Sequence, residues 1–447
     1  MAARADVPRP RALSRSRTAS FFGHPPGLAI LFFAEAWERF SFYGLRALLV
    51  FYLIKHLGFS QPDASQIYGT YTAAVYFTPL IGGYIADRWL GPRRAVVIGA
   101  VIMAAGHFLM AFEPMVFPAL ALVAIGNGAF KPSISAQVGR LYARDDPRRD
   151  GGYSLFYMGI NLGGLIAPLI CGTAGALYGW HWGFALAGLG MLAATAIYVF
   201  GQPLILEAEQ EAHSVAPPGP TSAGGARRSV MGLLVLALVA VFFWTAVEQM
   251  GNTVALWIDS DVDRTLAVGT QTFEIPTVWF QSLNPLLVIA LTPLLATAWT
   301  RGVKPGRHDS SLSKMIVGCL LAALAYAPLA VAAAAGVTGD LSLLLAVLFF
   351  VPLTLGELCL SPMGQSMFSR RAPVRYATLM MGAWFFAHTI GNYVAGYLGG
   401  FWSVMPKAAF FAMVGAIPLS CGLTLVVFRT GLERLFDTSL PPTPPRH

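Results

Sequence analysis

Long runs of apolar residues recur along almost the whole chain, separated by short polar segments. A helix that crosses a bilayer needs about 20 consecutive, mainly apolar residues. Twelve segments meet this requirement and predict twelve transmembrane helices: 27–54, 65–86, 95–113, 116–142, 152–177, 180–201, 230–251, 276–299, 313–335, 341–367, 377–400 and 406–428.

The longest polar stretch between these helices, residues 202–229, is rich in Pro, Gly, Ala and Glu and is typical of a flexible linker. It divides the helices six and six. A shift of 213 residues places Glu35 on Glu248, Tyr71 on Asn284 and Arg88 on Arg301, which supports two related halves. We therefore expect an all-α integral membrane protein with two six-helix bundles, the major facilitator superfamily fold, and a substrate site between the bundles. The expected domains are a tail (1–26), a first bundle (27–201), the linker (202–229), a second bundle (230–428) and a second tail (429–447).

Composition agrees with a membrane protein. Of the 447 residues 56% are hydrophobic and 12% charged, whereas soluble domains have about 25% charged residues. The first 25 residues lack an apolar stretch, so we expect no cleavable signal peptide. The four cysteines lie in apolar segments with a spacing that fits neither a metal site nor a disulfide framework: Cys171, Cys319, Cys359 and Cys421. We expect no metal and no cofactor other than protons as the coupling ion.

The formal net charge of +8 could suggest a nucleic-acid partner, but the distribution of the charges argues otherwise. With the N-terminus placed inside, 24 of the 30 Lys and Arg residues fall on the inner side, and only Lys55, Arg264 and Lys407 on the outer side. This asymmetry follows the positive-inside rule. It predicts two cytoplasmic termini and a lipid bilayer, not nucleic acid, as the surrounding partner.

One inner loop carries a recognisable motif, Gly83-Tyr-Ile-Ala-Asp-Arg-Trp-Leu-Gly-Pro-Arg-Arg94. It resembles the signature loop of the major facilitator superfamily. The resemblance implies that four charged side chains lock neighbouring helix ends in one conformation: Asp87, Arg88, Arg93 and Arg94.

Seven ionisable residues lie in the middle of predicted helices: Glu35, Glu38, Arg39, Arg46, Lys131, Glu248 and Glu357. An unpaired charge at the centre of a bilayer costs about 2.5–3.5 kcal/mol. Four acids and three bases nearly balance, so we expect them to face a wet cavity and one another. The surplus carboxylate is a natural proton carrier, because burial raises the pKa of a carboxyl group toward the working pH.

Helical spacing places several of these groups on one face. Glu35 and Arg39 are four residues apart, as are Arg39 and Tyr43, and Arg46 follows about one turn later. Protonation of a carboxylate beside an arginine would free the guanidinium to bind another anion. A static ion-pair network that holds the helices together is the alternative for any one of these residues.

These residues carry a resemblance to a known family. The segment Glu35-Ala-Trp-Glu-Arg-Phe-Ser-Phe-Tyr-Gly44 resembles the ExxERFxYYG motif of the proton-dependent oligopeptide transporter family, and Phe156-Tyr-Met-Gly-Ile-Asn-Leu-Gly-Gly-Leu165 is similar to its FYxxINxGSL signature. Gly126-Asn-Gly-Ala-Phe-Lys-Pro132 resembles its GxGxxKP segment. Further matching segments begin at Phe243, Phe280, Gly356 and Gly382.

The resemblance implies roles for individual residues. Proton coupling would involve Glu35, Glu38, Arg39 and Glu248, and a salt bridge between the bundles would join Lys131 to Glu357. The carboxylate end of a peptide would bind Arg39, Arg46 and Lys131, and its amino end would bind Glu357 with Asn161 and Asn284. The side-chain pockets would be shaped by Tyr43, Tyr71 and Trp384.

Two residues depart from the family pattern. Phe42 replaces the first of two tyrosines and removes a hydroxyl group, and His388 lies one turn beyond Trp384. We include His388 among the substrate-binding residues; it would titrate if it faced the cavity, and a packed histidine is the alternative. The segment 202–229 is too short and polar for the two additional helices of many bacterial members, and the large outer domain of animal members is missing. We expect a bacterial-type protein in the cytoplasmic (inner) membrane.

Together these patterns predict a monomeric symporter that imports di- and tripeptides with protons by alternating access. The alternatives are a carrier of the same family for a non-peptide nitrogenous solute, a channel, or a membrane enzyme. No nucleophile–base arrangement, HExxH motif or P-loop supports an enzyme.

Overall fold

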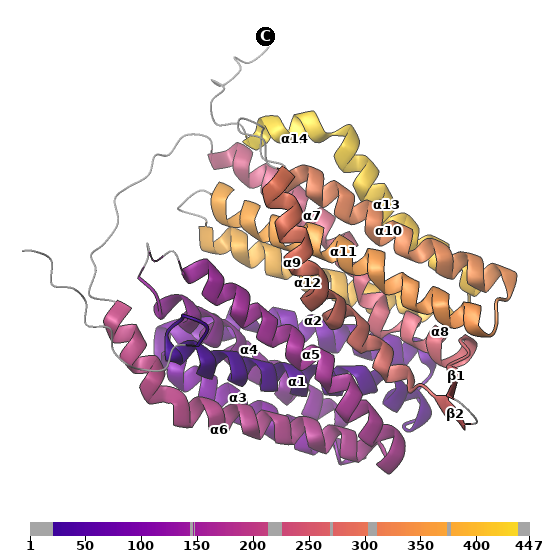
Figure 1. Cartoon of the computed structure of the whole chain (residues 1–447), viewed down its shortest axis with the longest axis horizontal. Coiled ribbons are helices and arrows are strands. Elements are labelled where there is room, and N and C mark those ends of the chain that lie inside the picture. The colour runs from indigo at the N-terminus through magenta and orange to yellow at the C-terminus, as the bar shows by residue number, and fades with distance from the viewer. Residues whose placement is uncertain are drawn as a thin grey trace, which may run out of the picture.

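In the computed structural model, the described residues are 21–143, 146, 148–212, 226–268, 271–302, 311–372 and 377–436. Six long helices form the first bundle, shown in indigo to magenta in Figure 1: α1 (Pro26–Lys55), α2 (Gln61–Ile85), α3 (Pro92–Leu109), α4 (Val116–Arg140), α5 (Arg149–Tyr178) and α6 (Trp180–Ala212). The second bundle contains α7 (Ala226–Val247), α9 (Leu283–Gly302), α10 (Ser311–Ala335), α11 (Asp340–Arg371), α12 (Ala377–Gly399) and α13 (Lys407–Val427).

Each of the twelve predicted transmembrane segments overlaps one of these helices, which confirms the predicted fold class. Within the described residues, nine helical stretches are long and apolar enough to cross a membrane by length and composition alone. Helix α1 is not among them, because its charged residues lie along its length. Helix α1 therefore differs from these nine stretches in the number of charged residues that it carries.

The connection between α7 and α9 is more structured than the apolar pattern indicated. A 3₁₀ turn, η3 (Glu248–Gly251), ends α7 and leads into the short helix α8 (Thr253–Asp261). An antiparallel hairpin follows, with β1 (Thr265–Val268) paired to β2 (Gln271–Glu274), and a second 3₁₀ segment, η4 (Thr277–Ser282), leads into α9. We call the end of the molecule that carries this hairpin the hairpin end.

The predicted linker is helical at both of its ends. Helix α6 continues to Ala212 and α7 begins at Ala226. Residues 213–225 lie outside the described residues, as do most of the N-terminal tail (1–20) and the end of the C-terminal tail (437–447). The short helix α14 (Arg429–Phe436) precedes that last segment.

The two bundles meet mainly along two lines of contact: α2 packs against α12, and α5 packs against the consecutive elements η4 and α9. The α2–α12 crossing is close because two glycines face each other. A Cβ atom added to Gly69 would lie 2.4 Å from the Cα atom of Gly396. Helices that approach through small residues in this way are common in membranes.

Polar contacts between the bundles gather at the hairpin end. Gln61 Nε2 donates to the carbonyl oxygen of Gly399 at 2.9 Å, and Ser65 Oγ donates to Asn252 Oδ1 at 2.8 Å. Lys55 Nζ forms an ion pair with Asp259 at 2.5 Å. Toward the opposite end, α5 and α9 border a cavity of about 200 Å³ lined by Tyr157, Asn161, Val288, Thr292 and neighbouring residues. The molecule is thus held closed at the hairpin end.

Candidate functional site

The site is built around one face of α1. Glu35, Glu38, Arg39 and Arg46 are all buried there, and Tyr43 is half-buried. Their three- and four-residue spacing, which predicted a common stripe, brings them to the inside of the protein. Buried charges need partners, and besides α1 itself those partners come from α2, α4 and η3.

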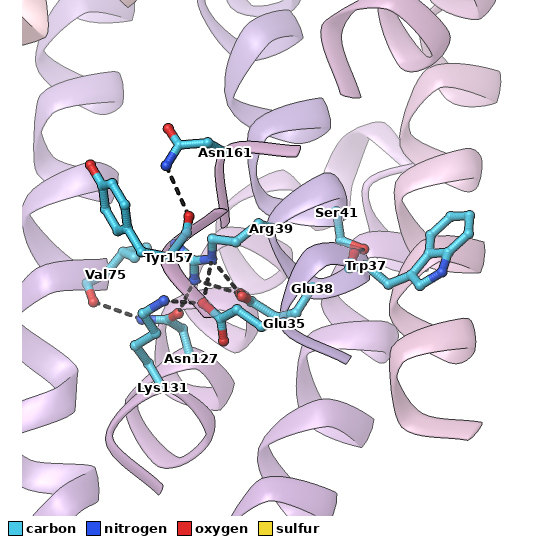
Figure 2. A network of polar contacts seen from close by, with 10 residues as sticks. All are labelled: Glu35, Trp37, Glu38, Arg39, Ser41, Val75, Asn127, Lys131, Tyr157 and Asn161. Carbon is cyan, nitrogen blue, oxygen red and sulfur yellow. Dashed lines mark hydrogen bonds and ion pairs between the residues drawn. The ribbon is translucent and has the colours of Figure 1, made fainter. Parts of the chain in front are cut away.

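Arg39 is the centre of the first cluster (Figure 2). Its Nε and Nη2 atoms donate to the two carboxylate oxygens of Glu38 at 2.5 and 2.6 Å. Nη2 also donates to Oδ1 of Asn127 on α4 at 3.0 Å, and Asn127 Nδ2 donates to the carbonyl oxygen of Val75 on α2 at 2.8 Å. A bidentate pair with a second acceptor fixes the guanidinium firmly.

Glu35 completes this cluster. Its Oε1 atom accepts a hydrogen bond from Lys131 Nζ of α4 and lies 3.6 Å from Arg39 Nε. Its other oxygen, Oε2, is buried and has no hydrogen-bond partner among the described residues. Both oxygens of Glu38 are therefore bonded, whereas Oε2 of Glu35 is free to accept a proton.

The predicted salt bridge between Lys131 and Glu357 is not formed in this conformation. Lys131 is bonded to Glu35 within its own bundle, and Asn284 of α9 holds Glu357 in the other bundle. In this conformation the carboxylate of Glu35 on α1 pairs with the lysine, and the bridge between the bundles stays a prediction for another state of the transport cycle.

A different ion pair joins the bundles. Arg46 Nη2 lies 2.6 Å from Glu248 Oε2, at the start of η3, and Arg46 Nε donates to Tyr68 Oη of α2 at 2.7 Å. Both charged side chains are almost completely buried. This pair lies toward the hairpin end from the Arg39 cluster, where it helps to hold the bundles together.

Glu357 is the surplus acid. Asn284 Nδ2 donates to Glu357 Oε2 at 2.9 Å and to Thr354 Oγ1 at 3.0 Å. Within the described part of the chain, Glu357 forms no ion pair, whereas the other three mid-membrane acids each do. The guanidinium carbon of Arg46 lies 5.9 Å from the centroid of the Tyr43 ring, and Gly164 of α5 lies close to both Tyr43 and Pro285 of α9, so Tyr43 lies near the meeting of the two bundles.

The aromatic residues near the cluster differ in their roles. The guanidinium carbon of Arg39 lies 4.8 Å from the centroid of the Phe42 ring, and Phe42 packs edge-on against Tyr43. The residue that departs from the family motif is therefore a cation–π partner of the central arginine. Tyr71 lies next to Phe42 and borders a cavity of about 480 Å³ between α2 and α4 of the first bundle.

Two predicted pocket residues are packed instead. Trp384 is completely buried, and its ring contacts Phe368 and the backbone position of Gly364 on α11. His388 is buried between Tyr76 of α2 and Trp244 of α7, with Nδ1 3.1 Å from the carbonyl oxygen of Trp384. Both side chains are buried, because neighbouring helices cover their face of α12. Asn161, by contrast, lines the α5–α9 cavity and donates to the carbonyl oxygen of Tyr157.

The loop that resembles the superfamily signature connects α2 to α3 through a tight turn. Residues Ala86–Leu90 form a π-helical turn, η1, and Gly91 has a positive φ of 74° before α3 begins. Arg93 forms an ion pair with Glu209 near the end of α6. Asp87, Arg88 and Arg94 are exposed and have no ion pair with a described residue. The structure thus supports a locking contact for Arg93 alone among the four predicted residues.

Sequence reasoning missed three polar residues of the site: Tyr68, Asn127 and Asn252. Tyr68 precedes Tyr71 by three residues, and Asn127 precedes Lys131 by four, so helical spacing placed both on the relevant faces. Asn252 follows η3, which the apolar pattern did not reveal.

Two bundles of six helices, with paired charges buried where the bundles meet, define a transporter of the major facilitator type. The model of the POT family matches residues 93–217 and 221–415, and the chain belongs to this family. It is 35% identical to the peptide transporter YePEPT of Yersinia enterocolitica, over 91% of this chain and 93% of the relative. It is 31% identical to a di-/tripeptide transporter of Lactococcus lactis subsp. cremoris, over 93% and 97%.

The fold is also similar to that of a solved transporter structure. A POT family transporter in complex with a thioalcohol-conjugated peptide has a TM-score of 0.82 and 28% identity, covering 92% of this chain and 98% of that chain. The chain is therefore a multi-pass membrane protein of this family.

Proposed function

We propose that this protein is a proton-coupled symporter that imports di- and tripeptides across the bacterial cytoplasmic membrane, with both termini in the cytoplasm. Family membership and the two named peptide-transporting relatives support the class of substrate. The distribution of Lys and Arg supports the orientation. The hairpin end is then the outer end, and this conformation is closed to the outside.

The observation that carries the proposal is the placement of the surplus acid. Glu357 lies in the second bundle without a cation partner among the described residues, while Arg39 and Lys131 lie in the first. A short peptide has an ammonium group and a carboxylate separated by roughly 5–10 Å when extended. It would place its ammonium group on Glu357 and its carboxylate toward the basic side chains.

The basic side chains are already paired, so the peptide carboxylate must compete with a protein carboxylate. Protonation removes that competitor. Glu35 has one buried oxygen without a partner, so it is the acceptor that a proton reaches without first breaking the bidentate bond of Glu38. Once neutral, Glu35 would release Lys131 to the peptide carboxylate. The membrane potential adds about 2.3 kcal/mol per charge for each 100 mV.

The outer gate would open when the contacts at the hairpin end break. Of these, Arg46–Glu248 is the charged pair buried deepest. Protonation of Glu248 would remove its charge and leave Arg46 bonded to Tyr68, which lowers the cost of separating the bundles. Proton binding and outward opening would thus be linked at this pair.

The test uses two ligands that differ at the amino end. Purified protein in proteoliposomes exchanges labelled dialanine in counterflow, and unlabelled dialanine or N-acetyl-dialanine is added as competitor. We expect dialanine to compete much better in the wild type, and Glu357→Gln to remove most of that preference. Equal competition by both ligands in the wild type would contradict the proposed role of Glu357. Failure of any peptide to exchange would favour a non-peptide solute.

A further inference from the structure

Three side chains with metal-binding atoms meet at the hairpin end of the first bundle. His56 directly follows α1, Glu113 begins the short 3₁₀ turn η2 (Glu113–Met115) between α3 and α4, and His181 is the second residue of α6. One ligand atom from each lies within 4.8 Å of the other two. The residues come from three separate elements, so the fold and not the local sequence brings them together.

Contacts among these three residues and with Tyr52 hold their side chains in place. His56 Nε2 lies 2.8 Å from Glu113 Oε1, and the two imidazole rings meet edge to face with centroids 5.5 Å apart. Tyr52, which is completely buried, stacks against His56 at 5.1 Å and packs edge-on against His181 at 6.3 Å. The tyrosine thus fixes the orientation of both rings.

One polar atom at this place has no partner. The Nδ1 atom of His181 is buried and accepts or donates no hydrogen bond within the described part of the chain. A buried imidazole nitrogen without a partner is costly, and each such group calls for an explanation. A bound ion beside these three side chains would supply one.

The donor set suits zinc. Two imidazoles and one carboxylate, with a fourth position open to water, form a common zinc coordination. Ligand atoms bonded at about 2.1 Å in a tetrahedron lie roughly 3.4 Å apart, and the atoms here are spaced from 2.8 Å to at most 4.8 Å. The side chain of His56 is 31% exposed and that of Glu113 is 56% exposed, which leaves room for entry and for water.

The surrounding charge does not oppose a cation. Lys55 is the nearest basic residue in sequence, and its ammonium group is paired with Asp259 at 2.5 Å. Glu113 adds a negative charge at the site itself. We propose that His56, Glu113 and His181 form a binding site for one Zn²⁺ ion on the outer rim of the first bundle.

All three ligands belong to the first bundle, so the site does not depend on how the bundles are arranged or on which solute is carried. The ion would join the end of α1, the α3–α4 connection and the start of α6. It would therefore raise the thermal stability of the protein without bridging the moving interface.

The experiment measures binding of Zn²⁺ alone to the purified full-length protein, carrying a tag without histidine, by competition with a chromogenic chelator. The thermal unfolding midpoint is recorded in parallel. Variants are His181→Asn, His56→Asn and Glu113→Gln. The control is His24→Asn, which removes a histidine at the opposite end of α1.

We expect one ion per wild-type chain and a rise in the unfolding midpoint with Zn²⁺. Each ligand variant should bind at least about tenfold more weakly and lose the rise, while His24→Asn should retain both. Glu113→Gln changes an exposed side chain without changing its size, so it guards against a folding defect in the histidine variants. Binding that is absent in the wild type, or equal in the wild type and all three ligand variants, would overturn the proposal.

Discussion

Individual residues in the middle of α1 determine what this protein does. The sequence predicted that seven ionisable groups would pair with one another, and six of them do so in the structure. It predicted the cluster of Glu35, Glu38 and Arg39, but not the partners of Lys131 and Arg46. Helical spacing fixes neighbours along one helix, as with Glu35 and Arg39, but the partner of Lys131 depends on how α4 packs against α1. No local pattern contains that information.

Replacement of Glu38 by glutamine tests the proton-linked cluster. Glu38→Gln keeps one acceptor for Arg39 but removes the carboxylate that pairs with it, so Glu35, 3.6 Å from Arg39 Nε, becomes the only carboxylate partner of Arg39 within the cluster and is no longer free to take up the proton. We expect proton-driven uptake of dialanine to fall to the level of empty liposomes, while counterflow without a gradient is largely retained. Both are measured in proteoliposomes. Full proton-driven accumulation by this variant would exclude a coupling role for Glu38.

Replacement of Phe42 tests the cation–π contact with Arg39. Phe42→Leu removes the ring and should lower stability by about 0.5–2 kcal/mol, in addition to the loss of packing. Phe42→Tyr keeps the ring and serves as the matched variant. The thermal unfolding midpoint should fall more for leucine than for tyrosine. A larger fall for tyrosine would mean that steric packing, not the ring face, matters at this position.

At the scale of elements, apolar runs predicted all twelve long helices, because a span of about 20 apolar residues has few alternatives in a membrane. The same criterion gave no signal for η3, α8 and the β1–β2 hairpin, which are short and partly polar. The same criterion also misplaced the boundaries of the predicted linker, because the polar residues 202–212 continue helix α6. Polarity marks the end of a membrane span but not the end of a helix.

The α2–α12 crossing gives an element-scale prediction. Gly69→Ala would place a Cβ atom 2.4 Å from Gly396 Cα and force the helices apart. Gly83→Ala, on the same helix, would meet only an ordinary contact at 3.4 Å with Pro132. Spin labels on Gln66 and Val404 should show a longer distance at the hairpin end in Gly69→Ala than in Gly83→Ala. Identical distances would show that the crossing does not hold the outer side closed.

The segment before α1 gives a pH-dependent contact outside the membrane. His24 Nδ1 lies 2.9 Å from Tyr142 Oη. Burial, with Arg148 nearby, lowers the pKa of His24 below its ordinary value of 6.5. A histidine with a lowered pKa in the folded state stabilises the fold fully above its unfolded pKa, and this contribution is lost as the pH falls through the folded value.

Histidine NMR checks this contact. We expect His24 in ¹³C-histidine-labelled protein to titrate with a midpoint below 6.5, and His24→Asn identifies its signal. A midpoint at or above the ordinary value would contradict the docked arrangement of this segment against the α4–α5 connection.

At the scale of the whole molecule, two bundles are held together at one end by polar and charged contacts, with a surplus acid in the second bundle and a paired basic cluster in the first. This is the arrangement that alternating access requires: contacts that break at one end while a solute with two charges satisfies both sides. The sequence pattern predicts the fold and the family. Which end of the transporter is closed depends on how the two bundles pack, and the sequence pattern does not contain that information.

The most direct test of the central claim is uptake of labelled dialanine into proteoliposomes under an imposed inward proton gradient. We predict accumulation above the external concentration, abolished by a protonophore and by Glu248→Gln. Uptake that merely equilibrates, with or without the gradient, would contradict proton-coupled transport.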